Sequence, residues 1–268
     1  MEDRVEEVMD LVDKAGDAIL EIYESDDFGT RIKEDDSPLT EADLSSHQVL
    51  TDGLSQMTPD IPILSEESDA LEFTERSEWD RFWLVDPLDG TKEFIKQNGE
   101  FTVNVALIEA GKPVIGVVGV PAKGTMYWAA DGVGAFKRTS SGETVRLRVT
   151  EDSRSREQMK VVVSRSHVND ETEEYARRVA ERAGNVELIP VGSALKLCMV
   201  AEGEAQVYPR LGPTMEWDVG AADCVVRQAG GVVRTMSGEE LRYNKEDLLN
   251  PFFVAACDET LMPDALGY

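Results

Sequence analysis

The sequence has few cysteines and no long apolar run. Its three cysteines are widely spaced and form no Cys-x-x-Cys pair, so neither a disulfide framework nor a cysteine zinc site is expected. No stretch approaches the roughly 18 apolar residues that cross a bilayer, so we expect no transmembrane segment. The first residues, Met-Glu-Asp-Arg-Val-Glu-Glu, lack the basic and apolar regions of a signal peptide. We therefore expect a cytoplasmic protein, with peripheral attachment to the inner membrane face left open.

Basic residues are also scarce. The 268 residues include 27 Lys and Arg against 53 Asp and Glu, which gives a formal net charge of −26. A field of this sign repels nucleic-acid phosphates and anionic lipids, so a polynucleotide partner is not expected. An acid-rich surface suits concentrated salt, where screening removes the self-repulsion. A halophilic source and an ordinary acidic cytosolic protein both stay open, and the composition indicates no oligomeric state.

Apolar spacing and turn signals divide the chain into two parts. Apolar residues three and four positions apart predict a helix over 2–24, and a second helix opens at 37–40 and runs to about Met57. Short strands follow at 61–64 and 81–85, the latter ending at Asp86-Pro87. Gly-containing turns over 101–149 predict an antiparallel meander. Strands and helices then alternate over 160–234, which indicates an α/β layer. We predict an α+β domain over 1–157 and an α/β domain over 158–268, packed as layers.

Three acidic segments carry the predicted chemistry. They are Leu64-Ser65-Glu66-Glu67, Asp86-Pro87-Leu88-Asp89-Gly90-Thr91 and Glu216-Trp217-Asp218. Each places carboxylates where a predicted strand ends or a helix begins, and such positions often form ligand sites in α/β layers. Four or more converging carboxylates cannot all stay ionised without cations. Oxygen ligands favour hard cations, so Mg²⁺ is expected first and Mn²⁺ next.

The segment from Asp86 to Thr91 is the strongest of the three. Its proline holds Asp86 extended, and the following turn brings Asp86 and Asp89 toward one point with the Leu88 carbonyl between them. The N–H groups of Gly90 and Thr91, at the start of a short helix, could bind a phosphate. A plain Asp-Gly turn with Asp89 as the helix cap is the alternative.

Thr40-Glu41-Ala42-Asp43 also has two interpretations. It fits a helix capping box, in which Asp43 reaches back to the backbone of Thr40. It also fits a catalytic pair, in which Asp43 binds the Thr91 hydroxyl and the two orient an attacking water. Glu66-Glu67 could likewise be a solvated turn and Asp218 only a helix cap, so these alternatives stay open.

Cationic and polar residues near predicted strand ends are candidate anion contacts in this acidic chain. A local surface ion pair is the alternative for each. They are Arg165, Ser166 and His167 after one strand, Ser193 and Lys196 at a helix start, and Arg210 after another strand.

Together the three acidic segments resemble the Mg²⁺-dependent, lithium-sensitive phosphatase superfamily that includes inositol monophosphatase. They occur in the family's order and at suitable separations, and the likeness covers nearly the whole chain. Within the superfamily, the chain is similar to the bacterial 3′(2′),5′-bisphosphate nucleotidase (CysQ) family. The segments that carry this second likeness are Trp83–Glu109 with Lys92-Glu93-Phe94-Ile95, Ser164-Arg165-Ser166-His167, Gly192-Ser193-Ala194-Leu195-Lys196 and Tyr208-Pro209-Arg210-Leu211-Gly212-Pro213-Thr214.

The resemblance implies a layered α-β-α-β-α fold and a role for each matching residue. Two or three Mg²⁺ ions would be held by Glu66, Asp86, the Leu88 carbonyl, Asp89 and Asp218. Asp43 and Thr91 would activate the attacking water. Substrate contacts would come from Glu67, Gly90, Thr91, His167, Ser193, Lys196 and Arg210. The acidic Glu216 departs from the family pattern, and we expect it to add negative charge near the metals.

The expected reaction is hydrolysis of the 3′-phosphate of adenosine 3′,5′-bisphosphate to AMP and phosphate by a metal-activated water. The first alternative is an inositol or sugar monophosphatase of the same superfamily. A phosphatase with a covalent aspartyl-phosphate is a second alternative, although its two aspartates are usually two residues apart rather than three. A non-catalytic acidic protein that binds divalent cations is the third, and the chain has no EF-hand loop.

Overall fold

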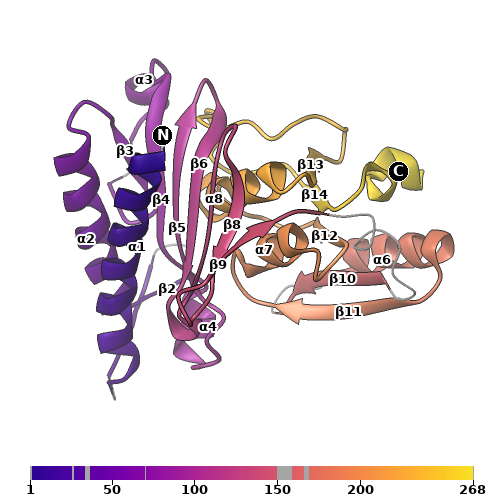
Figure 1. Cartoon of the computed structure of the whole chain (residues 1–268), viewed down its shortest axis with the longest axis horizontal. Helices are drawn as coiled ribbons and strands as arrows, with labels where there is room; N and C mark the ends of the chain where they lie inside the picture. Colours follow the sequence, from indigo (N-terminus) through magenta and orange to yellow (C-terminus); the bar gives the residue numbers. More distant parts are fainter. Residues whose placement is uncertain are drawn as a thin grey trace.

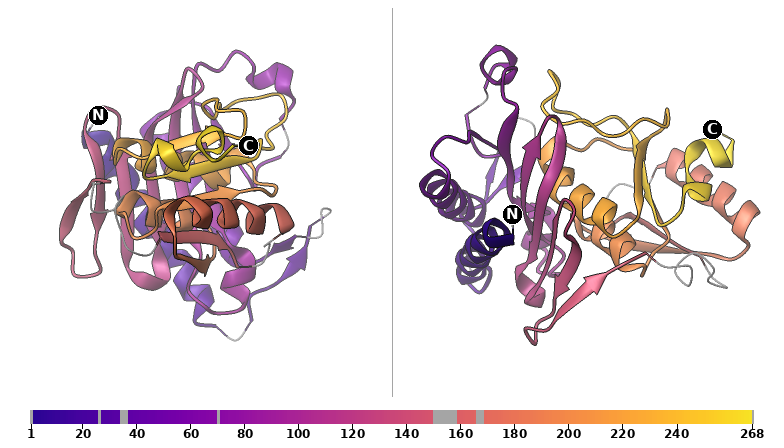
Figure 2. Two further views of the ribbon diagram at one scale, coloured as in Figure 1. Left: turned by 90° about the vertical axis from the view of Figure 1, so that its right-hand side faces the viewer. Right: turned by 45° about the horizontal axis from the view of Figure 1, so that its top comes forward.

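The protein folds into five layers in the order α-β-α-β-α, which confirms the predicted architecture (Figure 1 and the right-hand view of Figure 2). The structure is a computed structural model that describes residues 2–25, 27–33, 37–69, 71–149, 159–165 and 169–267. The layers are α1 (Glu2–Tyr23) with α2 (Glu41–Met57), a seven-stranded sheet, α7 (Leu195–Glu202) with α8 (Glu216–Gln228), a five-stranded sheet, and α6 (Asp170–Ala183). No helix in the described ranges is both long and apolar enough to cross a membrane.

The seven-stranded sheet is built from consecutive strands. Its first pair is parallel, and every later pair is antiparallel, so the meander predicted over 101–149 is confirmed. One face packs on α1 and α2, and the other packs on α7 and α8. The strands, in order across the sheet, are β3 (Ile63–Ser65), β4 (Arg81–Asp89), β5 (Thr102–Glu109), β6 (Lys112–Val120), β7 (Thr125–Ala130), β8 (Gly134–Arg138) and β9 (Thr144–Leu147).

Strand β4 does not end at Asp86-Pro87, as the sequence predicted, but continues to Asp89. Its pairing with β5 shifts register between Asp86, which lies opposite Asn104, and Asp89, which lies opposite Thr102. Pro87 falls inside this irregularity, where the N–H that proline lacks is not needed by the ladder. The strand therefore delivers two carboxylates to the same edge of the sheet.

The five-stranded sheet is mixed. Its three parallel strands agree with the alternation of strands and helices that the sequence predicted. The antiparallel strand β14 was not predicted, and it lies between β12 and β13. The order across the sheet is β11 (Val186–Val191), β10 (Met159–Ser164), β12 (Val207–Arg210), β14 (Phe253–Ala256) and β13 (Val232–Thr235). The polar run proposed as a domain boundary lies outside the described residues between β9 and β10, and the two-domain division stays a prediction.

Helix α8 joins the two halves because it packs on β4 to β8 of the large sheet and also contacts β13 of the small sheet. The approach is close: a Cβ on Gly116 of β6 would lie 2.2 Å from the Ala221 carbonyl oxygen, so only glycine fits there. The shorter elements are β1 (Arg31–Ile32) paired with β2 (Pro38–Leu39), α3 (Phe73–Arg76), α4 (Thr91–Ile95), α9 (Pro263–Leu266), and 3₁₀ turns at Pro121–Lys123 and Glu259–Leu261.

Helix α2 begins at Glu41, later than the sequence predicted. Residues Pro38 and Leu39 pair with β1 in extended conformation, so the helix cannot include them. Thr40 then caps the helix, and its hydroxyl accepts a hydrogen bond from Ala42 N at 3.2 Å. The β1–β2 pair is thereby fixed in front of the edge at which β3 and β4 end.

Candidate active site

A cavity of about 270 Å³ lies where the ends of β3 and β4 meet α7 and α8. Five carboxylates and three cationic side chains are among its lining residues. The lining comprises Ser37, Pro38, Glu66, Asp86, Leu88, Asp89, Gly90, Thr91, Lys92, Glu93, Ser164, Gly192, Ser193, Lys196, Arg210 and Asp218. Segments far apart in the sequence thus meet in one place, and all five residues predicted to hold metal are among them.

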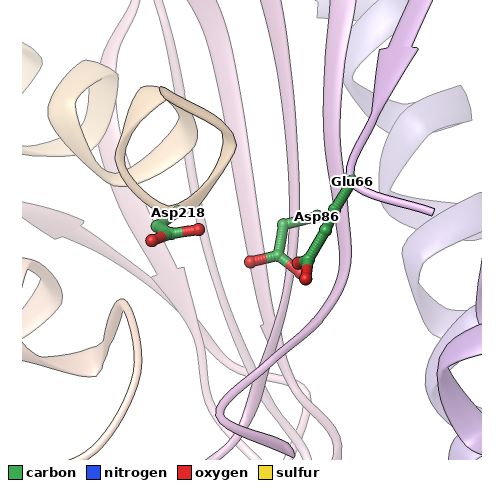
Figure 3. A group of neighbouring side chains, drawn as sticks. All are labelled: Glu66, Asp86 and Asp218. Carbon is green, nitrogen blue, oxygen red and sulfur yellow. The ribbon is translucent and has the colours of Figure 1, made fainter. Parts of the chain in front are cut away.

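Three of the carboxylates converge most closely (Figure 3). Glu66 follows β3, Asp86 lies on β4, and Asp218 lies in the first turn of α8. One oxygen of each lies within 4.8 Å of one oxygen of the other two. Figure 3 shows Glu66 and Asp86 side by side, with Asp218 reaching toward them from the opposite helix. Oxygens at this spacing can bind one hard cation together.

The chemistry of these carboxylates fits a divalent cation. Asp86 is buried, and its Oδ1 accepts a hydrogen bond from Leu88 N at 3.1 Å. Its Oδ2 is buried and has no hydrogen-bond partner among the described residues. Burial, and then the charges of Glu66 and Asp89, raise the pKa of Asp86 well above its usual value. Burial and the same two neighbours raise the pKa of Asp218. A cation would supply the charge that these oxygens lack.

Asp89 faces a different environment on the other side of the cavity. Burial raises its pKa from 3.8 to about 6, while Lys196, the Ala194 N–H and Arg210 oppose the rise. Burial lowers the pKa of Lys196 to about 8, and the Asp89 charge opposes that change. Near neutral pH both groups are therefore mainly charged. Asp89 lies between the acidic cluster and the cations of the second half of the chain.

Asp43 and Thr91 are joined by the predicted hydrogen bond. Thr91 Oγ1 donates to Asp43 Oδ1 at 3.1 Å. Asp43 Oδ2 accepts from Thr40 N at 2.7 Å and from Thr40 Oγ1 at 2.6 Å, so the capping box is present as well. The two interpretations are compatible because each uses a different carboxylate oxygen. Burial raises the pKa of Asp43, although the hydrogen bonds from Thr40 and Thr91 oppose the rise.

The predicted anion contacts divide into three groups. Ser193, Lys196 and Arg210 line the cavity, with Ser193 in a left-handed conformation (φ 50°) and Lys196 Nζ 2.7 Å from the Ser193 carbonyl. The Arg165 guanidinium instead forms an ion pair with the Glu100 carboxylate, with N–O distances of 2.7 Å and 2.9 Å. This is the local ion pair that was the alternative to an anion contact. Ser166 and His167 lie outside the described residues.

Lys33 is a site residue that the sequence analysis missed. Its Nζ lies 2.8 Å from Glu66 Oε1 and 2.5 Å from Glu67 Oε1. Burial alone would lower the pKa of Lys33, but these two carboxylates raise it above its usual value. No sequence signal marks this lysine, because its place depends on the β1–β2 pairing. Glu67 does not line the cavity described above, and its substrate contact stays a prediction.

The structure corrects the expectation that Glu216 adds negative charge near the metals. Its carboxylate forms an ion pair with Lys245 and accepts hydrogen bonds from Asn244 N at 2.7 Å and Lys245 N at 3.0 Å. The charge is therefore compensated locally, and Glu216 does not add an unpaired negative charge to the cluster.

Comparisons with known proteins agree with this geometry. The Inositol monophosphatase family matches residues 1–262. The 3′(2′),5′-bisphosphate nucleotidase CysQ of Salmonella typhimurium is 47% identical over 251 residues, which cover 93% of this chain and 98% of that protein. The crystal structure of CysQ from Bacteroides thetaiotaomicron, a bacterial member of the same family, has a TM-score of 0.84 and 43% identity, and the match covers 96% of this chain and 98% of that one.

A more distant structure shares the fold. It is an IMPase/NADP phosphatase complexed with Mg²⁺ and phosphate, with a TM-score of 0.77, 19% identity, and coverage of 97% of this chain and 91% of that one. The match to the family over nearly the full length, and the high identity to its nucleotidase members, lead to one assignment. The chain belongs to the inositol monophosphatase family and, within it, to the CysQ group.

Proposed function

We propose that this protein is a Mg²⁺-dependent phosphatase that hydrolyses the 3′-phosphate of adenosine 3′,5′-bisphosphate to AMP and phosphate. One observation carries the proposal. Carboxylate oxygens of Glu66, Asp86 and Asp218 converge within 4.8 Å at a cavity, and a buried oxygen of Asp86 lacks a partner within the described ranges. The 47% identity to a 3′(2′),5′-bisphosphate nucleotidase supports the substrate class.

Glu66, Asp86, Asp89, Asp218 and the Leu88 carbonyl would hold the cations. Two or three Mg²⁺ ions, or Mn²⁺ in their place, match this all-oxygen donor set. When bound, they would supply charge stabilisation for the phosphoryl oxygens and lower the pKa of the attacking water. They would also relieve the mutual repulsion that raises the pKa values of Asp86 and Asp218.

Thr91 and Asp43 provide the path for the proton. The Thr91 hydroxyl donates to Asp43 Oδ1, so its lone pairs are left to accept a hydrogen bond from the attacking water. The raised pKa of Asp43 makes it a stronger base than an exposed aspartate. As the water oxygen forms its bond to phosphorus, its proton passes through Thr91 to Asp43. The bond from phosphorus to the ribose 3′-oxygen breaks, and that oxygen leaves and takes a proton from solvent water to become the product alcohol.

Lys196 and Arg210 provide positive charge for the substrate anion. Lys196 is 6% exposed, and Arg210 lies beside it on the cavity wall. Arg210 Nε is a buried donor without a partner in the part of the chain that the structure describes. An unpartnered buried donor gains a full hydrogen bond when an anion arrives. Together with Ser193, these residues would hold the nucleotide, with His167 as a further proposed contact.

A phosphate-release panel tests the proposal. Adenosine 3′,5′-bisphosphate, inositol 1-phosphate and fructose 1,6-bisphosphate are compared by kcat/KM, each with Mg²⁺ and with EDTA. We expect the nucleotide to be preferred and phosphate release to stop in EDTA. Preference for inositol 1-phosphate would instead support the sugar-phosphatase alternative, and a trapped phosphoenzyme would contradict direct attack by water.

Two matched variants sharpen the panel. Asp218→Asn removes one carboxylate of the cluster while keeping the side-chain shape, and we expect it to lower phosphate release to background. Asp60→Asn removes one negative charge from an exposed turn and should keep the wild-type rate. Wild-type turnover in Asp218→Asn at millimolar Mg²⁺ would remove Asp218 from the metal site.

A further inference from the structure

The segment that follows β13 is hydrogen-bonded to the residues that precede Asp218. This stretch, residues 244–250, runs beside residues 214–216 and is bonded to them by backbone and side-chain groups. The Glu216 N–H donates to the Leu248 carbonyl at 3.0 Å. Asn250 donates from its N–H to the Thr214 carbonyl and from its Nδ2 to the Met215 carbonyl, both at 2.8 Å. The start of α8 is therefore held from outside the helix.

Glu216 is the centre of this contact. Its side chain is fully buried, and both carboxylate oxygens are used. Oε2 accepts from Asn244 N at 2.7 Å, and Oε1 accepts from Lys245 N at 3.0 Å and from the Lys245 ammonium. A buried carboxylate with both oxygens bonded in this way fixes its surroundings, because losing one partner leaves a buried charge uncompensated.

Arg76 extends the network to the other half of the protein. It lies in α3, five residues before β4, and is 2% exposed. Its guanidinium donates to Asn244 Oδ1 at 2.9 Å, and to the carbonyls of Lys245 at 2.6 Å and Glu246 at 2.9 Å. Asn244 Nδ2 donates back to the Arg76 carbonyl at 2.7 Å. A continuous set of bonds thus leads from the approach to β4 to the first turn of α8.

The two ends of this network are the elements that carry the converging carboxylates. Asp86 lies on β4, and Asp218 lies two residues after Glu216. The orientation of Asp218 also depends on the backbone of residues 214–216, because its Oδ2 accepts a hydrogen bond from Met215 N at 3.0 Å. Mg²⁺ requires near-ideal octahedral geometry at about 2.1 Å, so small displacements of one ligand weaken its binding.

We propose that Glu216 and Arg76, joined through residues 244–246, are positioning residues that set Asp218 against Asp86 and so determine the affinity for Mg²⁺. The inference rests on the proposed metal site. Neither residue touches the substrate or the cation. Each acts by fixing the distance between carboxylates that belong to different layers of the fold.

The test measures Mg²⁺ binding directly, by isothermal titration calorimetry without substrate. Glu216→Gln keeps the side-chain shape but leaves the Lys245 ammonium without its anionic partner. We expect its Kd for Mg²⁺ to rise about tenfold or more, the range typical of residues that orient metal ligands. The matched control is Glu202→Gln, because Glu202 is also a largely buried helical glutamate that pairs with a lysine, Lys137 at 2.6 Å, but it lies at the end of α7, away from residues 244–250. It should lose thermal stability while its Kd stays within about twofold of the wild type, since distant sites act independently.

If Glu216→Gln does not fold, a milder variant tests the positioning role. Asn244 has a left-handed backbone (φ 69°), which glycine adopts without strain. Asn244→Gly therefore removes the side-chain bonds to Arg76 and Trp79 and keeps the backbone donor to Glu216. We expect it, too, to weaken Mg²⁺ binding. Wild-type affinity in the folded variants, or equal weakening in Glu202→Gln, would overturn the inference and leave the proposed function standing. Absence of Mg²⁺ binding by the wild type would overturn both.

Discussion

Asp89 gives the sharpest test of the idea that the site is built for a cation. Its pKa of about 6, against 3.8 for an ordinary aspartate, means that the folded protein disfavours the ionised carboxyl. A difference of this size corresponds to about 3 kcal/mol. Solvent reaches the half-buried side chain, so we take this as an upper limit. Asp89→Asn, which mimics the neutral carboxyl, should therefore stabilise the metal-free protein.

The pH dependence follows from the direction of this pKa change. Because the folded pKa lies above the unfolded one, the folded protein binds the proton more tightly, and stability falls as pH rises from about 4 to about 6. The destabilisation is small at pH 4, about half developed at pH 5 and complete at pH 8. In EDTA at pH 8 we expect Asp89→Asn to melt about 5 °C above the wild type, and at pH 4 the difference should be small.

Scanning calorimetry with and without Mg²⁺ makes the measurement. Adding Mg²⁺ at pH 8 should raise the Tm of the wild type by more than that of Asp89→Asn, because only the wild type keeps the full ligand set. The exposed Asp60→Asn variant controls for the general loss of one negative charge. An Asp89→Asn protein that is less stable than the wild type in EDTA at pH 8, or a difference that does not change between pH 4 and pH 8, would refute the reasoning.

Two further predictions concern catalysis. Thr91→Ala should lower kcat about 100-fold or more with little change in KM, because it removes the hydroxyl between water and Asp43. Thr91→Ser should restore activity. An unchanged kcat in steady-state kinetics would exclude Thr91 from the proton path. The KM for adenosine 3′,5′-bisphosphate should rise as pH increases through about 8, where Lys196 loses its proton, and Lys196→Met should have a high KM that does not vary over this range. A KM that rises equally in both proteins would assign the titration to another group.

Much of the fold could be predicted from local patterns. The antiparallel meander followed from short apolar runs separated by glycine turns, and the alternation after residue 158 indicated the second sheet. Strand β14 (Phe253–Ala256) was missed because its four residues are all buried and apolar and carry no alternation. The continuation of β4 through Pro87 was missed because proline predicts a strand end, and only the register shift removes that conflict.

The candidate site was predicted best where the residues that meet belong to one short segment. Asp86 and Asp89 are three residues apart in one segment, so their role as neighbours could be inferred without a fold, although a register shift within β4 and not a turn brings them to one edge. The hydrogen bond between Asp43 and Thr91 joins residues 48 positions apart. In the sequence it was one of two interpretations of Asp43, and the local pattern favoured a helix cap.

The sequence by itself determined the family, the charge, and the carboxylates available to a cation, because these depend on residue type and on short-range spacing. Only the tertiary structure decided which charges are compensated. Lys33 lies on Glu66 and Glu67, Lys245 lies on Glu216, and Asp86 keeps a buried oxygen without a partner in the described ranges. Electrostatic energy depends on distance in space and on burial, and neither quantity can be read from the order of residues along the chain.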